Sequence, residues 1–246
     1  MKRGTFRSYT LLVDAPDITL RGLTVENAAG YPREKSGQCV ALYADGDRFL
    51  CEDCALVSHQ DTLFTAPLPP KEVEKNGFIG PKQFAPRTPQ RQTYRRCRIS
   101  GDVDFIFGGA AAWFEDCDIV FDDGRGETRT GDAGYCTAAS TPEGQRFGYV
   151  FDRCRFVSTG NERGTVLLGR PWREFAKTVL LHCELGAHIK PEGWGDWGKA
   201  AFHEHGYYAE YGCTGPGARG CRADFVHALT DEEAAAITYE AFLHSM

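Results

Sequence analysis

A six-residue pattern that recurs along the chain limits what this sequence can fold into. Each copy has an apolar residue, two further residues, a small apolar residue or cysteine, a variable residue and a final apolar residue. The six copies cover residues 20–25, 51–56, 94–99, 114–119, 151–156 and 180–185. The variable residue is polar in most copies, and this alternation predicts a half-buried strand.

The spacing between the copies is irregular and separates two kinds of repeat architecture. The fourth positions, Leu23, Cys54, Cys97, Cys117, Cys154 and Cys183, are 31, 43, 20, 37 and 29 residues apart. Propellers and helical solenoids keep a fixed period, whereas a β-solenoid keeps its strands and lets extra residues leave as loops. We therefore predict an all-β chain, a single-stranded parallel β-helix that forms one domain over residues 1–246.

The cysteines have a structural explanation in such a fold. The chain has 10 cysteines, but a disulfide scaffold is typical of much shorter secreted chains. Five of them take the fourth position of the pattern, where a stacked cysteine acts as a small apolar side chain. We expect this ladder to be core, without disulfides or metal ligands, and we expect no cofactor.

Two regions depart from the pattern. Six of the 12 prolines lie between Pro67 and Pro89, in a stretch with little strand character. We predict a long surface loop over residues 66–91, of the kind that often borders a binding groove. Near the end, Thr230-Asp231-Glu232-Glu233 is a capping box, which predicts one short C-terminal helix over about residues 230–243.

Charge and hydropathy exclude several partners. The formal net charge is −6, so the chain lacks the basic excess that general nucleic-acid binding needs. No apolar run is long enough to span a bilayer, and no export signal is visible. We expect neither a nucleic-acid nor a membrane partner. With free thiols and no signal, the sequence as given predicts a cytoplasmic protein.

Two aspartates occupy equivalent positions in successive copies. Asp61 and Asp104 each lie seven residues after the cysteine of their copy, and Phe64 and Phe107 each lie ten residues after it. If the cysteines stack, the two aspartates occupy equivalent positions on adjacent parallel strands, about 4.8 Å apart, which places their carboxyl groups side by side. Like charges that close resist joint ionisation, so one group stays protonated. An acid beside a base suits ester hydrolysis; the alternative is that each aspartate is an ordinary turn residue.

Four strings occur in a fixed order and span nearly the whole chain. They are Gln38-Cys39-Val40-Ala41-Leu42, Gln60-Asp61-Thr62-Leu63-Phe64, Gly101-Asp102-Val103-Asp104-Phe105-Ile106-Phe107-Gly108 and Leu168-Gly169-Arg170-Pro171-Trp172. This series resembles the pectin methylesterase (pectinesterase) family of carbohydrate esterases. The resemblance implies a right-handed parallel β-helix. Compared with the family the chain is N-terminally shortened, because the first strand, expected at residues 9–13, lies close to Met1.

The resemblance also implies a reaction and a role for each site residue. The reaction is hydrolysis of galacturonate methyl esters in pectin or oligogalacturonides, a step of pectin degradation and cell-wall modification that releases methanol. Asp104 is the implied nucleophile and Asp61 the acid and base. Gln38 and Gln60 are implied to stabilise the oxyanion. Arg170 is implied to pair with Asp104 and keep it ionised.

Aromatic residues are implied to bind the substrate. Trp172 and Trp194 are expected to stack on sugar rings, and Phe64 and Phe107 to line the site. Two alternatives from other classes stay open. One is a lyase or glycosidase that acts on the same polymer, and the other is a β-helix that binds oligogalacturonides without catalysis.

The shortened N-terminus has two further implications. A first coil without a cap exposes backbone donors and acceptors, which favours self-association through that coil. If a preceding segment carried an export signal, the protein would be secreted instead of cytoplasmic.

Overall fold

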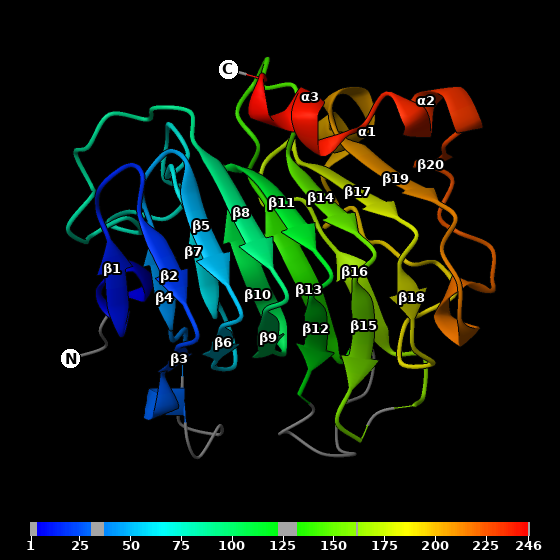
Figure 1. Cartoon of the computed structure of the whole chain (residues 1–246), viewed down its shortest axis with the longest axis horizontal. Coiled ribbons are helices and arrows are strands. Elements are labelled where there is room, and N and C mark those ends of the chain that lie inside the picture. Colours follow the sequence, from blue (N-terminus) through cyan, green and yellow to red (C-terminus); the bar gives the residue numbers. More distant parts are fainter. Residues whose placement is uncertain (1–3, 31–36, 123–131, 161, 246) are drawn as a thin grey trace.

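Three parallel sheets, wound from one chain, make up most of the protein (Figure 1). The structure is a computed structural model and describes residues 4–30, 37–122, 132–160 and 162–245. Sheet A contains β1 (Leu11–Val13), β4 (Leu42–Ala44), β7 (Leu63–Thr65), β10 (Val103–Gly108), β13 (Gly134–Ala139) and β16 (Val166–Gly169). Sheet B contains β2 (Thr19–Arg21), β5 (Phe49–Glu52), β8 (Arg91–Arg95), β11 (Ala111–Glu115), β14 (Tyr149–Asp152), β17 (Lys177–Leu181), β19 (Tyr207–Tyr211) and β20 (Val226–Ala228). Sheet C contains β3 (Thr24–Glu26), β6 (Ala55–Val57), β9 (Arg98–Gly101), β12 (Asp118–Phe121), β15 (Arg155–Ser158) and β18 (Glu184–Leu185).

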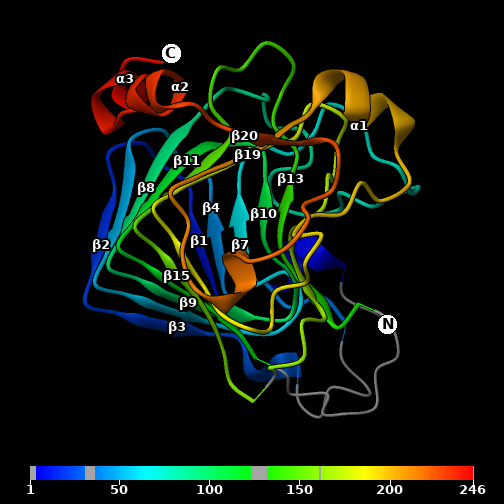
Figure 2. The same ribbon diagram turned by 90° about the vertical axis from the view of Figure 1, so that its right-hand side faces the viewer.

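The chain visits the three sheets in turn, so each coil adds one strand to each sheet. From β1 to β18 the order A, B, C repeats without exception, and neighbouring strands in a sheet are parallel. The view along the stack shows the sheets around a common core (Figure 2). This is the predicted single-stranded, right-handed parallel β-helix. β1, β2 and β3 each lie at an edge of their sheet, and self-association through this coil stays a prediction.

The six-residue pattern is a corner between two strands, so the prediction of one strand per copy is wrong in that detail. The third residue of every copy has a positive φ, between 48° and 66°. These corner residues are Gly22, Asp53, Arg96, Asp116, Arg153 and His182. That backbone conformation is uncommon outside glycine, and it turns the chain sharply from sheet B into sheet C. The period of the apolar residues does not reveal such a corner, because side chains on both sides of it still face the core.

The cysteine ladder is confirmed as core. Cys54, Cys97, Cys117, Cys154 and Cys183 are all buried and free. Aromatic rings form a second ladder beside it, since Phe114 stacks on Tyr94 and Phe151 with ring centroids 4.7 and 4.4 Å apart. Buried thiols and stacked rings therefore fill the coil, and the buried Tyr94 hydroxyl donates to the Gln92 side chain at 2.8 Å.

Short helices lie outside the coils. They are the 3-10 turns η1 (Thr5–Arg7), η2 (Ala28–Gly30) and η5 (Pro216–Ala218), and the α-helices α1 (Ala200–His205), α2 (Asp231–Ala235) and α3 (Tyr239–Leu243). Within the described ranges, none has the length and apolar character needed to cross a bilayer. Residues 66–90, between β7 and β8, contain no helix or strand, as predicted.

The predicted capping box is present, but the single helix over about residues 230–243 is wrong. The Thr230 hydroxyl accepts the Glu233 N–H, and the Glu233 side chain accepts the Thr230 N–H. The helix ends at Ala235, however, and a second one begins after Thr238, whose hydroxyl accepts the Ala241 N–H. A threonine that caps a new helix competes with continuation of the old one. Tyr239 of α3 packs on Trp113 of sheet B, with ring centroids 5.6 Å apart.

Candidate active site

Asp61 and Asp104 lie on adjacent coils, where the chain enters sheet A. β7 and β10 pair in the predicted register, with Phe64 opposite Phe107. The Asp61 N–H donates to the Val103 carbonyl at 3.1 Å. Both aspartates have a positive φ, 67° and 50°, a conformation that aspartate tolerates better than most residues. The same unusual turn on two neighbouring coils therefore brings the two carboxyl groups together.

Gly101 allows this close approach of the coils. A Cβ placed on Gly101 would lie 2.3 Å from the Phe105 Cβ and 2.4 Å from the His59 carbonyl oxygen. Next to it, the Thr62 hydroxyl donates to the Ser100 carbonyl at 2.8 Å. Only a residue without a side chain fits between the two segments that carry the aspartates.

Arg170 holds Asp104 through both carboxylate oxygens. Its Nε lies 2.8 Å from Oδ1 and its Nη2 lies 2.7 Å from Oδ2, so the predicted pair is present. The guanidinium is held between two aromatic rings, because Cζ is 3.6 Å from the Trp197 ring centroid and 3.9 Å from that of Tyr135. A planar cation between two π-faces has little freedom to leave the carboxylate.

The surroundings give the two carboxyl groups different protonation. Burial raises the pKa of Asp61 well above its ordinary value, and the nearby charge of Asp104 raises it further. Burial also raises the pKa of Asp104, but the hydrogen bonds and charge of Arg170 oppose that rise. Asp104 therefore loses its proton first, and Asp61 keeps its own. The site holds one carboxylate and one carboxylic acid.

The two predicted glutamines lie beside this pair. Gln38 accepts a hydrogen bond from the Thr5 hydroxyl at 2.5 Å, and its amide hydrogen-bonds the Asp61 carboxyl group. Gln60 is half-buried, and its backbone carbonyl accepts the Cys39 N–H at 3.0 Å. Adjacent coils therefore present both residues at the same edge of the site.

Phe64 and Phe107 are on the outer face of sheet A and are almost completely covered. Phe64 is 0% exposed, so the prediction that it touches substrate is wrong. Phe107 is 4% exposed, and its contact with substrate stays a prediction. Phe6 of η1 covers both of them, with ring centroids 4.9 and 6.1 Å away. Phe78 packs on Phe6 from the far side. Trp172 also contacts this cluster but remains half-buried.

The prediction for Trp194 is also wrong, and the sequence reading missed the tryptophan that does lie at the site. Trp194 is 2% exposed, stacks on Tyr208 at 4.3 Å and donates its Nε1–H to Glu210 at 2.7 Å. Trp197, three residues later, is 43% exposed and covers Arg170. The two tryptophans share one glycine-rich segment, so their order along the chain gave no signal of which one is core.

Lys199 is a further residue that the sequence did not single out. Its Nζ lies 3.9 Å from the Trp197 ring centroid. Burial, together with the charges of Arg173 and Arg170, lowers the pKa of Lys199 to about 8.

Within the described ranges, no group of three or more His, Cys, Asp or Glu residues is placed to hold a metal ion.

Comparison with known proteins shows to which family the chain belongs. The family model described as Pectinesterase matches residues 1–68 and 87–246. The chain belongs to the pectinesterase family. Residues 69–86 of this pectinesterase-family chain lie outside the match and form most of the long segment between β7 and β8.

Named relatives and solved structures support the same assignment. The chain is 35% identical to the probable pectinesterase/pectinesterase inhibitor 64 of Arabidopsis thaliana over 87% of its length, but spans 33% of that relative. It is 33% identical to pectinesterase 31 of the same plant, over 98% of this chain and 65% of the relative. Pectin methylesterase from carrot superposes with a TM-score of 0.78 at 28% identity, over 99% of this chain and 70% of the carrot chain. A pectin methylesterase in complex with a hexasaccharide gives a TM-score of 0.77 at 28% identity, over 99% and 74% of the two chains.

Proposed function

We propose that this chain hydrolyses galacturonate methyl esters in pectin or oligogalacturonides and releases methanol. The observation that carries the proposal is the pair of buried carboxyl groups, one ionised by Arg170 and the other protonated. Ester hydrolysis needs a nucleophile beside a proton donor, and the pair supplies both. Membership of the pectinesterase family supports the same reaction and the same substrate class.

In the first half of the reaction, an Asp104 oxygen attacks the ester carbonyl carbon and forms a new C–O bond. Negative charge develops on the carbonyl oxygen, where the amide groups of Gln38 and Gln60 donate hydrogen bonds. Asp61 gives its proton to the methoxy oxygen as the bond to that oxygen breaks. Methanol leaves, and the galacturonyl group stays on Asp104 as a mixed anhydride.

In the second half, water completes the cycle. Asp61, now a carboxylate, takes a proton from a water molecule as the water oxygen attacks the acyl carbon. The bond to Asp104 breaks and returns that residue as a carboxylate, while galacturonic acid leaves. Asp61 ends protonated, as it began, so the pair returns to its first state. Trp172 and Trp197 provide aromatic surface beside the pair for the neighbouring sugar rings.

Methanol assays on the purified protein test the proposal. We expect methanol from both methylated pectin and methylated oligogalacturonides without added metal. Products with ultraviolet absorbance would indicate a lyase, and new reducing ends would indicate a glycosidase. Calorimetric binding of oligogalacturonides without methanol release would favour the non-catalytic alternative. Any of these three results in place of methanol would overturn the proposal.

Arg170→Lys should lower kcat for methanol release by about 10- to 100-fold, the range expected when a charged hydrogen bond is lost. Lysine keeps the positive charge, but it cannot hold both oxygens of Asp104 or fill the space between Trp197 and Tyr135. Steady-state kinetics on a methylated oligomer measure the effect. Arg155→Lys is the matched control, because Arg155 makes the same two-oxygen contact with a surface aspartate. Equal rates for the Arg170 and Arg155 variants would contradict the assigned role.

A further inference from the structure

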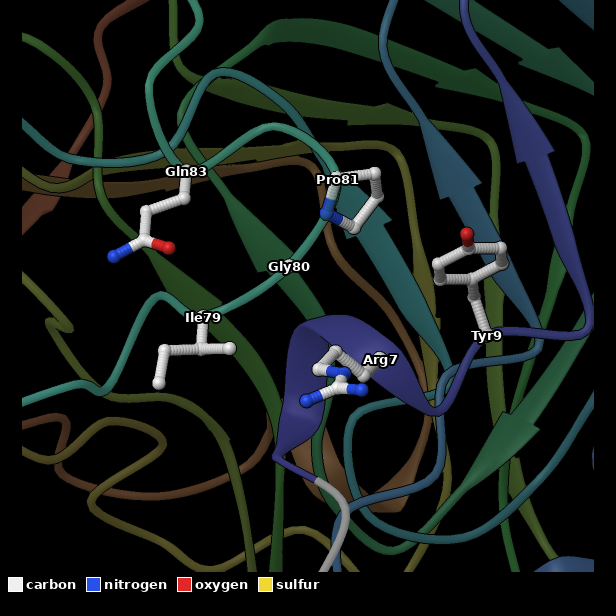
Figure 3. Close-up of a pocket in the computed structure, with 6 residues that line it drawn as sticks. All are labelled: Arg7, Tyr9, Ile79, Gly80, Pro81 and Gln83. Atoms are coloured by element: carbon white, nitrogen blue, oxygen red, sulfur yellow. The ribbon is translucent and has the colours of Figure 1, made fainter.

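A pocket of about 350 Å³ opens beside η1, on the outside of sheet A (Figure 3). Arg7 and Tyr9 line one side of it, and the other side is formed by the segment between β7 and β8. The residues from that segment are Ile79, Gly80, Pro81 and Gln83. Since residues 69–86 lie outside the match to the pectinesterase family, this wall belongs to the present chain and not to the family pattern.

The three residues of η1 link the pocket to the catalytic pair. Thr5 donates to Gln38, which in turn hydrogen-bonds Asp61. Phe6 packs between the aromatic side chains of sheet A and Phe78. Arg7, the next residue, faces the pocket (Figure 3). One short turn therefore connects the ester-cleaving groups to the pocket.

The segment that forms the outer wall is held in place by many contacts. Arg87 donates to the backbone carbonyls of Pro69, Lys82, Gln83 and Ala85 at distances from 2.5 to 3.3 Å. Phe78 is buried against Phe6, with ring centroids 5.7 Å apart. Lys82 forms ion pairs with Asp14 and Asp45. A wall fixed in this way does not have to be ordered when a ligand binds.

The lining matches an acidic sugar. Arg7 is exposed and forms no ion pair with any described residue, so its guanidinium is available to a carboxylate. The Tyr9 hydroxyl and the Gln83 amide offer hydrogen bonds to sugar hydroxyls. Ile79 and Pro81 offer apolar surface to the C–H face of the ring. A methyl ester carries no charge, so this lining favours a free carboxylate over an esterified one.

We propose that this pocket is a subsite for an unesterified galacturonate residue in the same polymer chain whose methyl ester reaches Asp104. The inference rests on the proposed function and adds a selection rule to it. Substrates that carry a free carboxylate at this position bind better than fully methylated ones. The selecting cation is Arg7, and the segment 69–86 completes the pocket around it.

Calorimetry with a fully de-esterified oligogalacturonate tests the subsite without requiring any catalysis. We expect Arg7→Gln to weaken binding by about 10-fold, as the loss of one charged contact predicts, and to reduce the dependence of Kd on salt. Arg98→Gln is the matched control, since Arg98 is an exposed arginine on sheet C, and its Kd should equal that of the unaltered protein. Equal Kd values for the Arg7 variant and the unaltered protein would overturn the subsite.

Kinetics separate this inference from the proposed function. With partially de-esterified oligomers, Arg7→Gln should raise KM about 10-fold and leave kcat unchanged, whereas KM for fully methylated oligomers should not change. Gln83→Ala should shift KM in the same direction by a smaller factor, and circular dichroism checks that both variants fold. An equal rise in KM on both substrates would refute the selection of a free carboxylate. Absence of methanol from every substrate would refute the proposed function and leave the binding result to decide on the subsite.

Discussion

Asp104→Asn should abolish methanol release, with a fall in kcat of roughly 10⁴-fold or more. Asparagine has nearly the same shape as aspartate, but its amide carries no negative charge and is a poor nucleophile. The ester then meets Asp61 and the oxyanion donors without any group that can form the acyl intermediate. Methanol assays at high enzyme concentration measure the loss. Mass spectrometry of the variant excludes deamidation back to aspartate.

The control for this variant separates chemistry from stability. Asp118→Asn removes the same kind of arginine-paired carboxylate from the outer surface, where Asp118 contacts Arg155 at 2.8 Å through each oxygen. That variant should keep full activity. Both variants should unfold close to the temperature of the unaltered protein, because asparagine retains one oxygen to accept an arginine N–H. Substantial activity in Asp104→Asn would assign the nucleophile to another residue.

The sequence was sufficient to predict the coils and the close approach of Asp61 and Asp104, because both depend on local spacing. A position that faces a narrow core does not accept a charged residue. Cys97 and Cys117 occupy such positions, so their place in the sequence indicates where each coil passes the core. Asp61 and Asp104 follow their cysteines by equal numbers of residues. In parallel strands on adjacent coils, residues at equal distances from stacked cysteines lie opposite one another. The observed register of β7 and β10 follows from this equal spacing.

Features that depend on contacts between distant segments were not predictable in the same way. An apolar residue such as Phe64 suits contact with a sugar ring and contact with Phe6 equally well, so its type does not distinguish the two. The position of η1, which brings Phe6 onto Phe64, leaves Phe64 0% exposed. A further corner of the same kind has Gly212 at its third position, with a φ of 62°. The six-residue pattern does not detect this corner, because its first position holds Glu210 instead of an apolar residue. The side chains that donate hydrogen bonds to Glu210, Trp194 and Arg222, come from other parts of the chain.

Asp61→Asn should lower kcat by about 10²- to 10⁴-fold, the usual contribution of a positioned acid and base, and should change the shape of the pH profile. In the unaltered protein, activity requires Asp104 ionised and Asp61 protonated. Activity therefore falls at low pH as Asp104 gains a proton, and falls at high pH as Asp61 loses its own. Because burial and the charge of Asp104 raise the pKa of Asp61 well above its ordinary value, the acid form persists above the pH at which most aspartates ionise.

Asparagine at position 61 has no proton to lose in this range, so the residual rate should show the low-pH fall without the high-pH fall. Lys199 is the rival source of a high-pH fall, since its pKa is lowered to about 8 and its charge acts on Asp104. Lys199→Met distinguishes the two: it should keep the high-pH fall if Asp61 is the acid. A profile that loses this fall in Lys199→Met but keeps it in Asp61→Asn would assign the titration to the lysine. The substitution that removes the high-pH fall therefore identifies the group whose titration causes it, independently of how far each substitution lowers kcat.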